Sequence, residues 1–237
     1  MTTSHFSDGP RSLVLLGTGT SLRRAPWTDK AQQMWGPAYL WGRVKRLDIG
    51  FQIHDDTIER AKPTWKAVQE SRVPVYMQRC HDDVPRSQPY PLEDVRRRFT
   101  LPGMVRPFTT NTTSYMLALA LLQRPLPEKV SLFGVDLVHG EEYAFEQPSV
   151  SFFLGICVGC DIPVYIDPAS DLLKTRFLYG FEESARAVQA GELRERELLF
   201  RIQRDKELET IHAGLTKVTH LNALITDAMQ FLRRTLD

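Results

Sequence analysis

The sequence has few cysteines and no excess of charge of either sign. Its three cysteines, Cys80, Cys157 and Cys160, are too few and too unevenly placed for a disulfide framework, and their odd number favours a reducing compartment. Thirty basic residues stand against 29 acidic ones, so the chain lacks the overall field that would attract a polyanion such as duplex DNA. We therefore expect a cytoplasmic protein for which nucleic acid is not the default partner.

Signals for secretion and for membranes are lacking as well. The first ten residues are polar, without the basic start and apolar run of a secretory signal. No apolar stretch approaches the roughly 18 to 20 residues that span a bilayer, and the longest, Tyr115 to Leu122, has the length of one helix face. We expect no membrane partner.

Several catalytic signatures are absent. The chain has neither the third glycine of the dinucleotide fingerprint nor the lysine of a P-loop after its first glycine pair, which disfavours NAD binding and simple ATP hydrolysis. It also has no Gly-x-Ser-x-Gly elbow and no Asp-x-Asp signature. A transferase built on this chain is expected to work without a metal.

What the sequence does contain is a strand and helix alternation. Five short apolar runs predict buried strands, and segments of helical period, Thr113 to Gln123 and Ser149 to Val158, lie between them. This order predicts an α/β fold, a Rossmann-like, doubly wound and mainly parallel sheet covered on both faces. The predicted strands are Ser12 to Leu16, Arg46 to Ile53, Val73 to Met77, Lys129 to Leu137 and Ile162 to Ile166.

Composition divides the chain into two parts. Residues 1–180 are expected to form a nucleotide-binding domain, in which the proline-rich stretch 78–108 is an irregular loop or lid. Residues 181–237 lack proline and predict a helical extension.

The extension carries apolar residues at alternating spacings of three and four, with Asn222 among them. This is the seam of a coiled coil, which would make the protein a homo-oligomer. The same stripe is also the core face of a helix, so Gly214 could instead break the segment into two antiparallel helices packed on the sheet domain. The stripe comprises Leu208, Ile211, Leu215, Val218, Asn222, Ile225, Met229, Leu232 and Leu236.

Two segments have the composition of an anion-binding turn. After the first strand, Gly17 and Gly19 allow a tight turn and a close approach to a phosphate, while Thr18, Thr20 and Ser21 supply hydroxyls. The alternative is a tight turn that binds nothing.

The second segment precedes a predicted helix. Asn111, Thr112, Thr113 and Ser114 gather hydroxyls and unpaired N–H groups at a positive helix terminus. Ordinary capping needs only one of the four, and the surplus favours a ligand.

Candidates for proton transfer follow other strands. His54 and His81 each open a His-Asp-Asp tripeptide near a strand end, where histidine can act as a general acid or base and aspartate can bind ribose or a metal. Aspartate after a strand is equally a helix cap. Asp136 ends another strand, and Tyr143 could stack on a base or hydrogen bond a phosphate. The Cys157 and Cys160 pair lacks a second pair and is interpreted as structural.

The order of these motifs resembles the bacterial CMP-sialic-acid-dependent sialyltransferases. The resemblance spans residues 12–180 and rests on Gly-Thr-Gly-Thr-Ser-Leu at 17–22, Thr-Thr-Ser-Tyr at 112–115, Phe-Gly-Val-Asp at 133–136, Tyr-Ala-Phe at 143–145 and Pro-Ala-Ser-Asp at 168–171. It extends to the motility-accessory-factor and hydroxymethylpterin pyrophosphokinase-like proteins. The chain as a whole looks most like proteins of tailed bacteriophages, which would place it in the host cytoplasm.

The resemblance implies a nucleotide or nucleotide-sugar ligand. Gly17, Thr18 and Gly19 would lie near its phosphate or ribose, Thr112 and Thr113 beside the phosphate, Asp136 in the crevice and Tyr143 on the leaving phosphate. The expectation that His54 is the base comes from its place after a strand and not from the resemblance. The family has asparagine between the two glycines, where this chain has Thr18. The leading hypothesis is therefore a glycosyltransferase-like enzyme. Non-catalytic nucleotide binding and pyrophosphoryl transfer to a small heterocycle are the alternatives.

Overall fold

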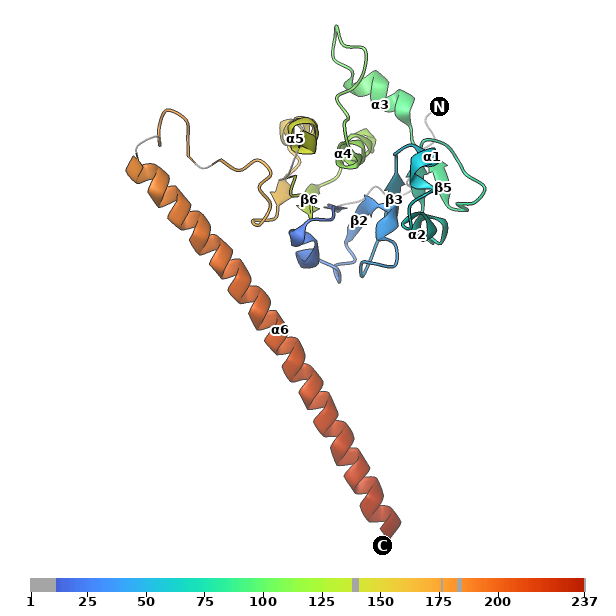
Figure 1. Cartoon of the computed structure of the whole chain (residues 1–237), viewed down its shortest axis with the longest axis vertical. Helices are drawn as coiled ribbons and strands as arrows, with labels where there is room; N and C mark the ends of the chain where they lie inside the picture. Colours follow the sequence, from blue (N-terminus) through green and yellow to red (C-terminus); the bar gives the residue numbers. More distant parts are fainter. Residues whose placement is uncertain (1–11, 138–140, 176, 183–184, 237) are drawn as a thin grey trace. The chain divides into compact units, whose positions relative to one another are not determined.

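The computed structural model describes residues 12–137, 141–175, 177–182 and 185–236. Some side chains inside the last two helices lie outside this description. The chain divides into two compact units, Met1–Lys174 and Thr175–Asp237. In chain order the elements are β1 Ser12–Leu16, η1 Thr20–Arg24, β2 Gln32–Pro37, η2 Ala38–Leu40, β3 Ile49–Gln52, α1 Asp56–Glu59, α2 Trp65–Gln69, β4 Val75–Met77, β5 Ser87–Pro89, α3 Leu92–Phe99, α4 Thr112–Leu122, β6 Lys129–Phe133, α5 Glu141–Gly159, β7 Val164–Ile166 and α6 Ala185–Leu236 (Figure 1).

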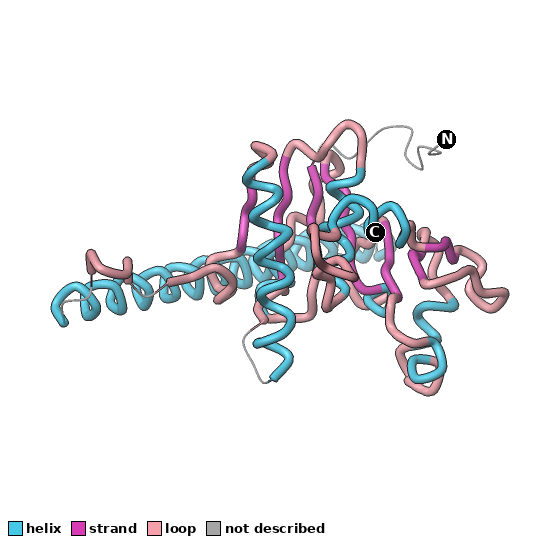
Figure 2. The backbone as a smooth tube through the Cα atoms, turned by 90° about the horizontal axis from the view of Figure 1, so that it is seen from above, coloured by secondary structure: helices cyan, strands magenta, loops and turns pink. Residues whose placement is uncertain are grey.

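The first unit is built on one sheet of seven strands in the order β5-β4-β3-β2-β1-β6-β7. Every pairing in it is parallel. Figure 2 shows the strands of this sheet in magenta. The chain adds strands in one direction from β1 to β5 and then returns to add β6 and β7 on the other side of β1. The predicted Rossmann-like α/β architecture is confirmed, and the strand order reverses between β1 and β6.

Strand residues alternate between two cores. Leu13 and Leu15 of β1 belong to a large cluster with side chains of α3, α4 and α5, and these helices lie on the same side of the sheet in Figure 1. Val14 and Leu16 point to the opposite face, where they pack with residues of β2 and of the connections after β1 and β2. Both faces are covered, which explains why the strands are apolar on both sides.

Helix α4 is apolar on nearly every side because it is buried between α3, α5 and the sheet. Asn111 begins it with a capping box: its side chain accepts a hydrogen bond from the Ser114 amide, and the Ser114 hydroxyl accepts one from the Asn111 amide. The helix ends at Leu122, shortly before Pro125, which cannot continue a helix.

Three expectations of secondary structure are corrected. The stretch 78–108 is not an irregular loop throughout, since it contains β5 and the eight-residue helix α3. Strand β2 lies in a segment for which no strand was predicted. Helix α5 begins at Glu141, so Pro148 lies inside it rather than before it.

The second unit contains α6, which spans Ala185–Leu236 as one helix. Gly214 lies within that helix, so the alternative of two antiparallel helices broken at this glycine is wrong. Among the residues that the structure describes, no helix combines the length and apolarity needed to cross a membrane.

Candidate functional site

The point where the strand order reverses is formed by two interlocked loops. In open parallel sheets, ligands bind outside the carboxyl ends of the strands at such a point, because short loops and helix starts converge there. The loop after β1 begins at Gly17, and the loop after β6 begins at Gly134. The Gly17 amide donates to the Phe133 carbonyl at 2.8 Å, and the Gly19 amide donates to the Gly134 carbonyl at 2.7 Å.

The glycines are needed for this contact between loops. A Cβ at Gly17 would lie 2.1 Å from the Gly134 oxygen, and a Cβ at Gly19 would lie 2.1 Å from Oδ2 of Asp136. Gly134 itself adopts φ +72°, which side chains rarely allow. The glycines therefore permit a close contact between the loop after β1 and the loop after β6, rather than one between the chain and a phosphate.

The carboxylate of Asp136 occupies the turn. Its Oδ2 accepts a hydrogen bond from the Thr20 amide at 2.8 Å and lies 3.3 Å from the Thr20 hydroxyl, while its Oδ1 accepts from the Ser21 hydroxyl at 3.0 Å. Ser21 is fully buried, and its oxygen also accepts from the Gly134 amide at 2.6 Å. The donors expected for a ligand phosphate are thus bonded to an anion that the chain supplies.

Thr18 stays at the surface of this turn, beside Tyr39 of η2. Burial raises the pKa of the Tyr39 phenol, the charge of Glu59 raises it further, and a hydrogen bond with Thr18 opposes these shifts. Arg24, at the end of η1, forms an ion pair with the buried Asp167, which follows β7. That bond is the main cause of the raised pKa of Arg24. Neither Tyr39 nor Arg24 was singled out from the sequence. Arg24 is the last residue of η1, the short helix that begins directly after the glycine turn.

The second hydroxyl-rich segment lies at the same edge of the sheet. Tyr90 follows β5, and its amide donates a hydrogen bond to the carbonyl of Met77 at the end of β4. Its hydroxyl donates to the Tyr115 carbonyl in the first turn of α4, at 2.8 Å. Helix α4 packs on β2 and β3. Its amino terminus therefore lies near the carboxyl ends of the strands.

The four polar residues at the start of α4 divide into two pairs. Asn111 and Ser114 form the capping box, and Asn111 also donates to the Glu146 carbonyl at 3.2 Å. Thr112 and Thr113 are half-buried, and within the described part of the chain their hydroxyls have no hydrogen-bond partner. Capping thus accounts for two of the four predicted residues and leaves two hydroxyls at a positive helix terminus.

His54 follows β3 at this edge and has a largely exposed ring. Its Nδ1 lies 3.8 Å from Oε1 of Glu59, a side chain that is only 9% exposed and that also bonds Lys62 at 2.5 Å. Nε2 of His54 is therefore the nitrogen left to accept a proton from another molecule. Asp55 caps α1 through hydrogen bonds from the Thr57 hydroxyl and amide, which lower its pKa, as the helix-cap alternative predicts.

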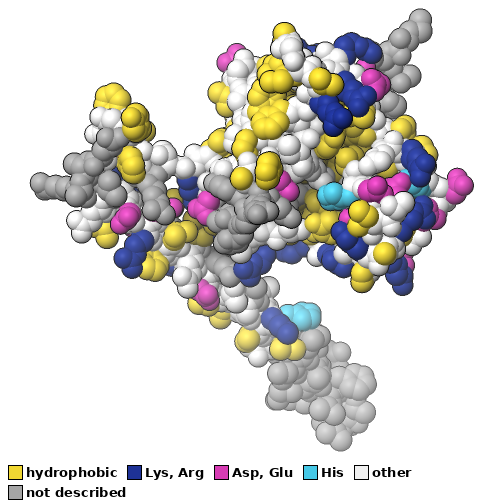
Figure 3. Space-filling view, turned by 45° about the horizontal axis from the view of Figure 1, so that its top comes forward, with side chains coloured by type: hydrophobic (Ala, Val, Ile, Leu, Met, Phe, Trp, Pro, Cys, Tyr) yellow, Lys and Arg dark blue, Asp and Glu magenta, His cyan; other side chains and the backbone are white. Residues whose placement is uncertain are grey.

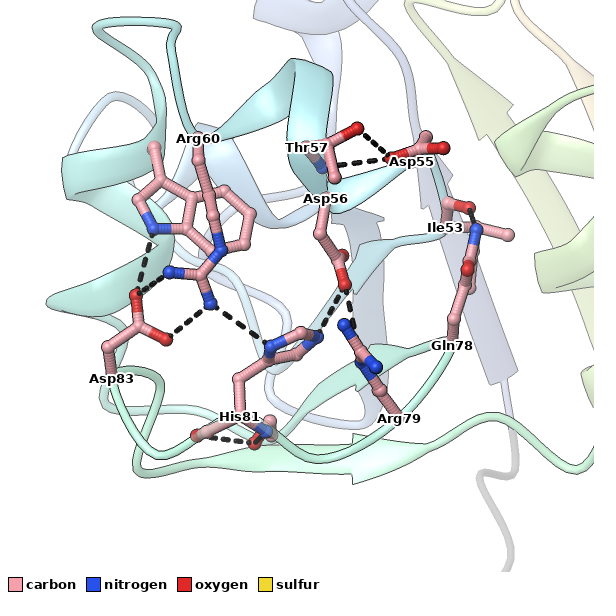
Figure 4. Close-up of polar contacts among 11 residues, drawn as sticks. Ile53, Asp55, Asp56, Thr57, Arg60, Gln78, Arg79, His81 and Asp83 are labelled. Atoms are coloured by element: carbon pink, nitrogen blue, oxygen red, sulfur yellow. Dashed lines mark hydrogen bonds and ion pairs between the residues drawn. The ribbon is translucent and has the colours of Figure 1, made fainter.

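The second histidine, His81, is held inside a network (Figure 4). Its Nδ1 faces Arg60 at 3.1 Å, and because a guanidinium can only donate, this nitrogen accepts and the proton lies on Nε2. Nε2 lies 2.8 Å from Oδ2 of the buried Asp56, but the two atoms do not have the geometry of a hydrogen bond. Arg60 bonds Asp83 at 2.8 and 2.9 Å. Because the His81 side chain is only 6% exposed and its Nδ1 is bonded to Arg60, this histidine joins α1 to the β4–β5 connection rather than serving as a base.

Two further sequence candidates are placed only in part. Tyr143 lies in the first turn of α5, where its side chain is outside the described residues. Cys157 is fully buried, and burial raises the pKa of its thiol to about 12, whereas Cys160 is exposed. A thiol that stays protonated at neutral pH is not a redox nucleophile.

Comparisons with known proteins give no further assignment. No protein-family model matches the chain, and neither the curated proteins nor the solved structures contain a significant match.

Proposed function

We propose that the first unit binds a nucleotide-activated donor at the carboxyl edge of its sheet and transfers the activated group, as a glycosyltransferase-like enzyme does. The observation that carries the proposal is the start of α4, where Thr112 and Thr113 keep free hydroxyls within the described part of the chain after capping is complete. A nucleotide phosphate is the ligand class that such a terminus suits, since helix N–H groups and hydroxyls donate to its oxygens.

The transfer follows from these positions. An acceptor hydroxyl oxygen would attack the anomeric carbon of the donor sugar, and the bond from that carbon to the phosphate oxygen would break. The acceptor proton would pass to Nε2 of His54, whose Nδ1 lies 3.8 Å from Oε1 of Glu59, close enough for that carboxylate to stabilise the protonated ring. The phosphate would leave with the electron pair, and Thr112 and Thr113 would stabilise its charge. Tyr143 would add a hydrogen bond to the departing phosphate, as its phenol allows and the family resemblance implies.

The first test removes the hydroxyls while preserving shape. Thr112→Val with Thr113→Val is expected to weaken binding of a nucleoside monophosphate or diphosphate about tenfold or more, because two neutral hydrogen bonds to a charged group are lost. Isothermal titration with CMP, UDP, ADP and GDP measures it. Release of nucleotide from CMP- and UDP-sugars, followed by chromatography, measures turnover.

Thr110→Val is the matched control. It removes a hydroxyl from the same segment, but this hydroxyl donates to the Phe145 carbonyl at 2.8 Å, so binding is expected to stay unchanged while stability falls. Equal loss of binding in both variants, or unchanged binding in the double variant, would show that the start of α4 does not hold the ligand.

Binding of a nucleotide without catalysis is a second candidate. It is favoured because other titratable side chains at this edge are already bonded within the chain and are not available to transfer a proton. Asp136 accepts hydrogen bonds within the glycine turn, and the His81 side chain is only 6% exposed with its Nδ1 bonded to Arg60, so among the residues that the structure describes His54 is the histidine at this edge with an exposed ring. A protein that only sequesters a nucleotide would bind it tightly and return it unaltered after long incubation. His54→Gln distinguishes the two functions: it abolishes turnover in the enzyme and has no effect on the affinity of a sequestering protein.

A further inference from the structure

Helix α6 presents a stripe of large apolar side chains to solvent. Leu208, Ile211, Leu215 and Val218 are 53–61% exposed, and Figure 3 shows yellow hydrophobic side chains on the surface of the described part of this helix. A helix in water keeps such a stripe only if a partner covers it, because isolated helices are marginal and gain most of their stability from packing.

The spacing of the stripe identifies the kind of partner. Apolar residues at alternating steps of three and four keep one seam along a helix and let it wind around identical helices. The seam runs from Leu208 to Leu236, over about four heptads, and its two positions are usually named a and d. Position a holds Leu208, Leu215, Asn222, Met229 and Leu236, and position d holds Ile211, Val218, Ile225 and Leu232.

The residue types at the two positions set the number of helices. Leucine at a with β-branched residues at d disfavours the two-stranded coil and favours larger bundles, whereas the reverse arrangement favours two strands. Here a is leucine at three of its positions, and d is isoleucine or valine at Ile211, Val218 and Ile225.

The flanking positions agree with a larger bundle. Between Leu208 and Met229, positions e and g carry no Lys, Arg, Asp or Glu, and Arg233 is the one such residue at these positions within the seam, so the salt bridges that commonly border two-stranded coils have few donors and no acceptors there. Uncharged flanks can be buried between neighbouring helices when more than two meet. These flanking residues are His212, Gly214, Thr219, Leu221, Thr226 and Ala228.

We propose that residues 208–236 of α6 form a parallel coiled coil of four copies of this chain. Asn222, on the seam, fixes one register and keeps the helices parallel, because a polar group at a in one helix must meet its counterparts in the others. The assembly depends on α6 alone and does not rest on the proposed function of the first unit.

Native mass spectrometry and light scattering of the full chain test the proposal. The expected mass is four times the 27.2 kDa of one chain. Leu215→Glu is expected to give monomers, since it would bury four like charges in one layer. Lys217→Glu, two residues away at the outward position c, is expected to leave the mass of the assembly unchanged. A wild-type mass of one, two or three chains would overturn the proposal, as would a Leu215→Glu protein that keeps the wild-type mass.

A second variant tests the number of copies without introducing charge. Exchanging the residue types, with isoleucine at Leu208, Leu215 and Leu236 and leucine at Ile211, Val218 and Ile225, is expected to reduce the mass by half. Unchanged tryptophan fluorescence would show that the first unit remains folded in each variant, because all four tryptophans lie there. An exchanged protein that keeps the wild-type mass would contradict the assignment of a and d.

Discussion

The glycine turn after β1 and the start of α4 have similar compositions, but they differ in how far their hydrogen-bond donors are satisfied within the chain. Both combine small or hydroxyl residues with a helix start at the carboxyl edge of the sheet. In the turn, Asp136 accepts from Thr20 and Ser21, so the donors are satisfied within the chain. At α4, the capping box uses Asn111 and Ser114 and leaves two threonine hydroxyls. The comparison shows that a phosphate-binding composition is not itself a site, because the chain can supply the anion.

The largest effect should come from Gly17→Ala. The added Cβ would lie 2.1 Å from the Gly134 oxygen. The Cβ is fixed by the backbone at residue 17 and the oxygen belongs to the backbone at residue 134, so neither atom can rotate away. We expect the free energy of unfolding to fall by about 3 kcal/mol. Urea titration followed by tryptophan fluorescence measures it.

Gly155→Ala provides the control for Gly17→Ala. Gly155 lies in α5, where a Cβ would meet nothing within 4 Å, so alanine should stabilise the unit by about 0.5–1 kcal/mol. If both alanines changed the free energy of unfolding equally, the close contact between the two loops would not explain why position 17 is glycine.

Asp136→Ala should have the next largest effect. It tests directly whether the glycine turn differs from the start of α4 because Asp136 occupies the place of an anion. Loss of the carboxylate leaves the Thr20 amide and the Ser21 hydroxyl without their acceptor, which should cost about 2 kcal/mol. The emptied turn would then resemble an anion site, so inorganic phosphate should raise the melting temperature of the variant more than that of the wild type. Sodium chloride of equal ionic strength is the control. A larger phosphate effect on the wild type would show that Asp136 does not stand in the place of an anion.

Asn111→Ala should have an intermediate effect. It removes the N-cap of α4 and the bond to the Glu146 carbonyl, and caps contribute about 1 kcal/mol. The same urea titration measures the loss. A cost below the error of that measurement would mean that the capping box does not stabilise α4.

The smallest effect is expected from Thr113→Val. Its hydroxyl has no partner in the described part of the chain, so the free energy of unfolding should change by less than about 0.5 kcal/mol. Thermal unfolding beside Thr110→Val sharpens the contrast, because only Thr110 uses its hydroxyl internally. A cost for Thr113→Val equal to that for Thr110→Val would place the hydroxyl in the structural network.

The fold was largely predictable because its main signal is local. The runs that became β1 and β6 are continuous and apolar, and periodicity detects such runs. Strand β2 combines two glutamines with Gly36 and Pro37, and β5 is the tripeptide Ser-Gln-Pro, so neither carries that signal. Pro148 argued against the first two turns of α5, because proline is costly inside a helix.

The candidate site was predictable only as composition. Glycines and hydroxyls mark turns and helix starts, and the sequence located both segments correctly at strand and helix ends. Which donors remain available depends on partners far along the chain: Thr20 and Asp136 are 116 residues apart. The same limit applies to His54 and His81, whose tripeptides are identical in sequence, while Arg60 and Asp56 engage only the second ring.

The edges of the sheet have a consequence for any assembly of this chain. Strands β5 and β7 are three residues long, and β5 ends in Pro89, which has no N–H to offer a neighbouring strand. Joining copies through a helix raises the local concentration of their sheets, which in many proteins promotes pairing of exposed edges and aggregation. Short edges of this kind give an added strand little to pair with, so the protein can gather several sheets and remain dispersed.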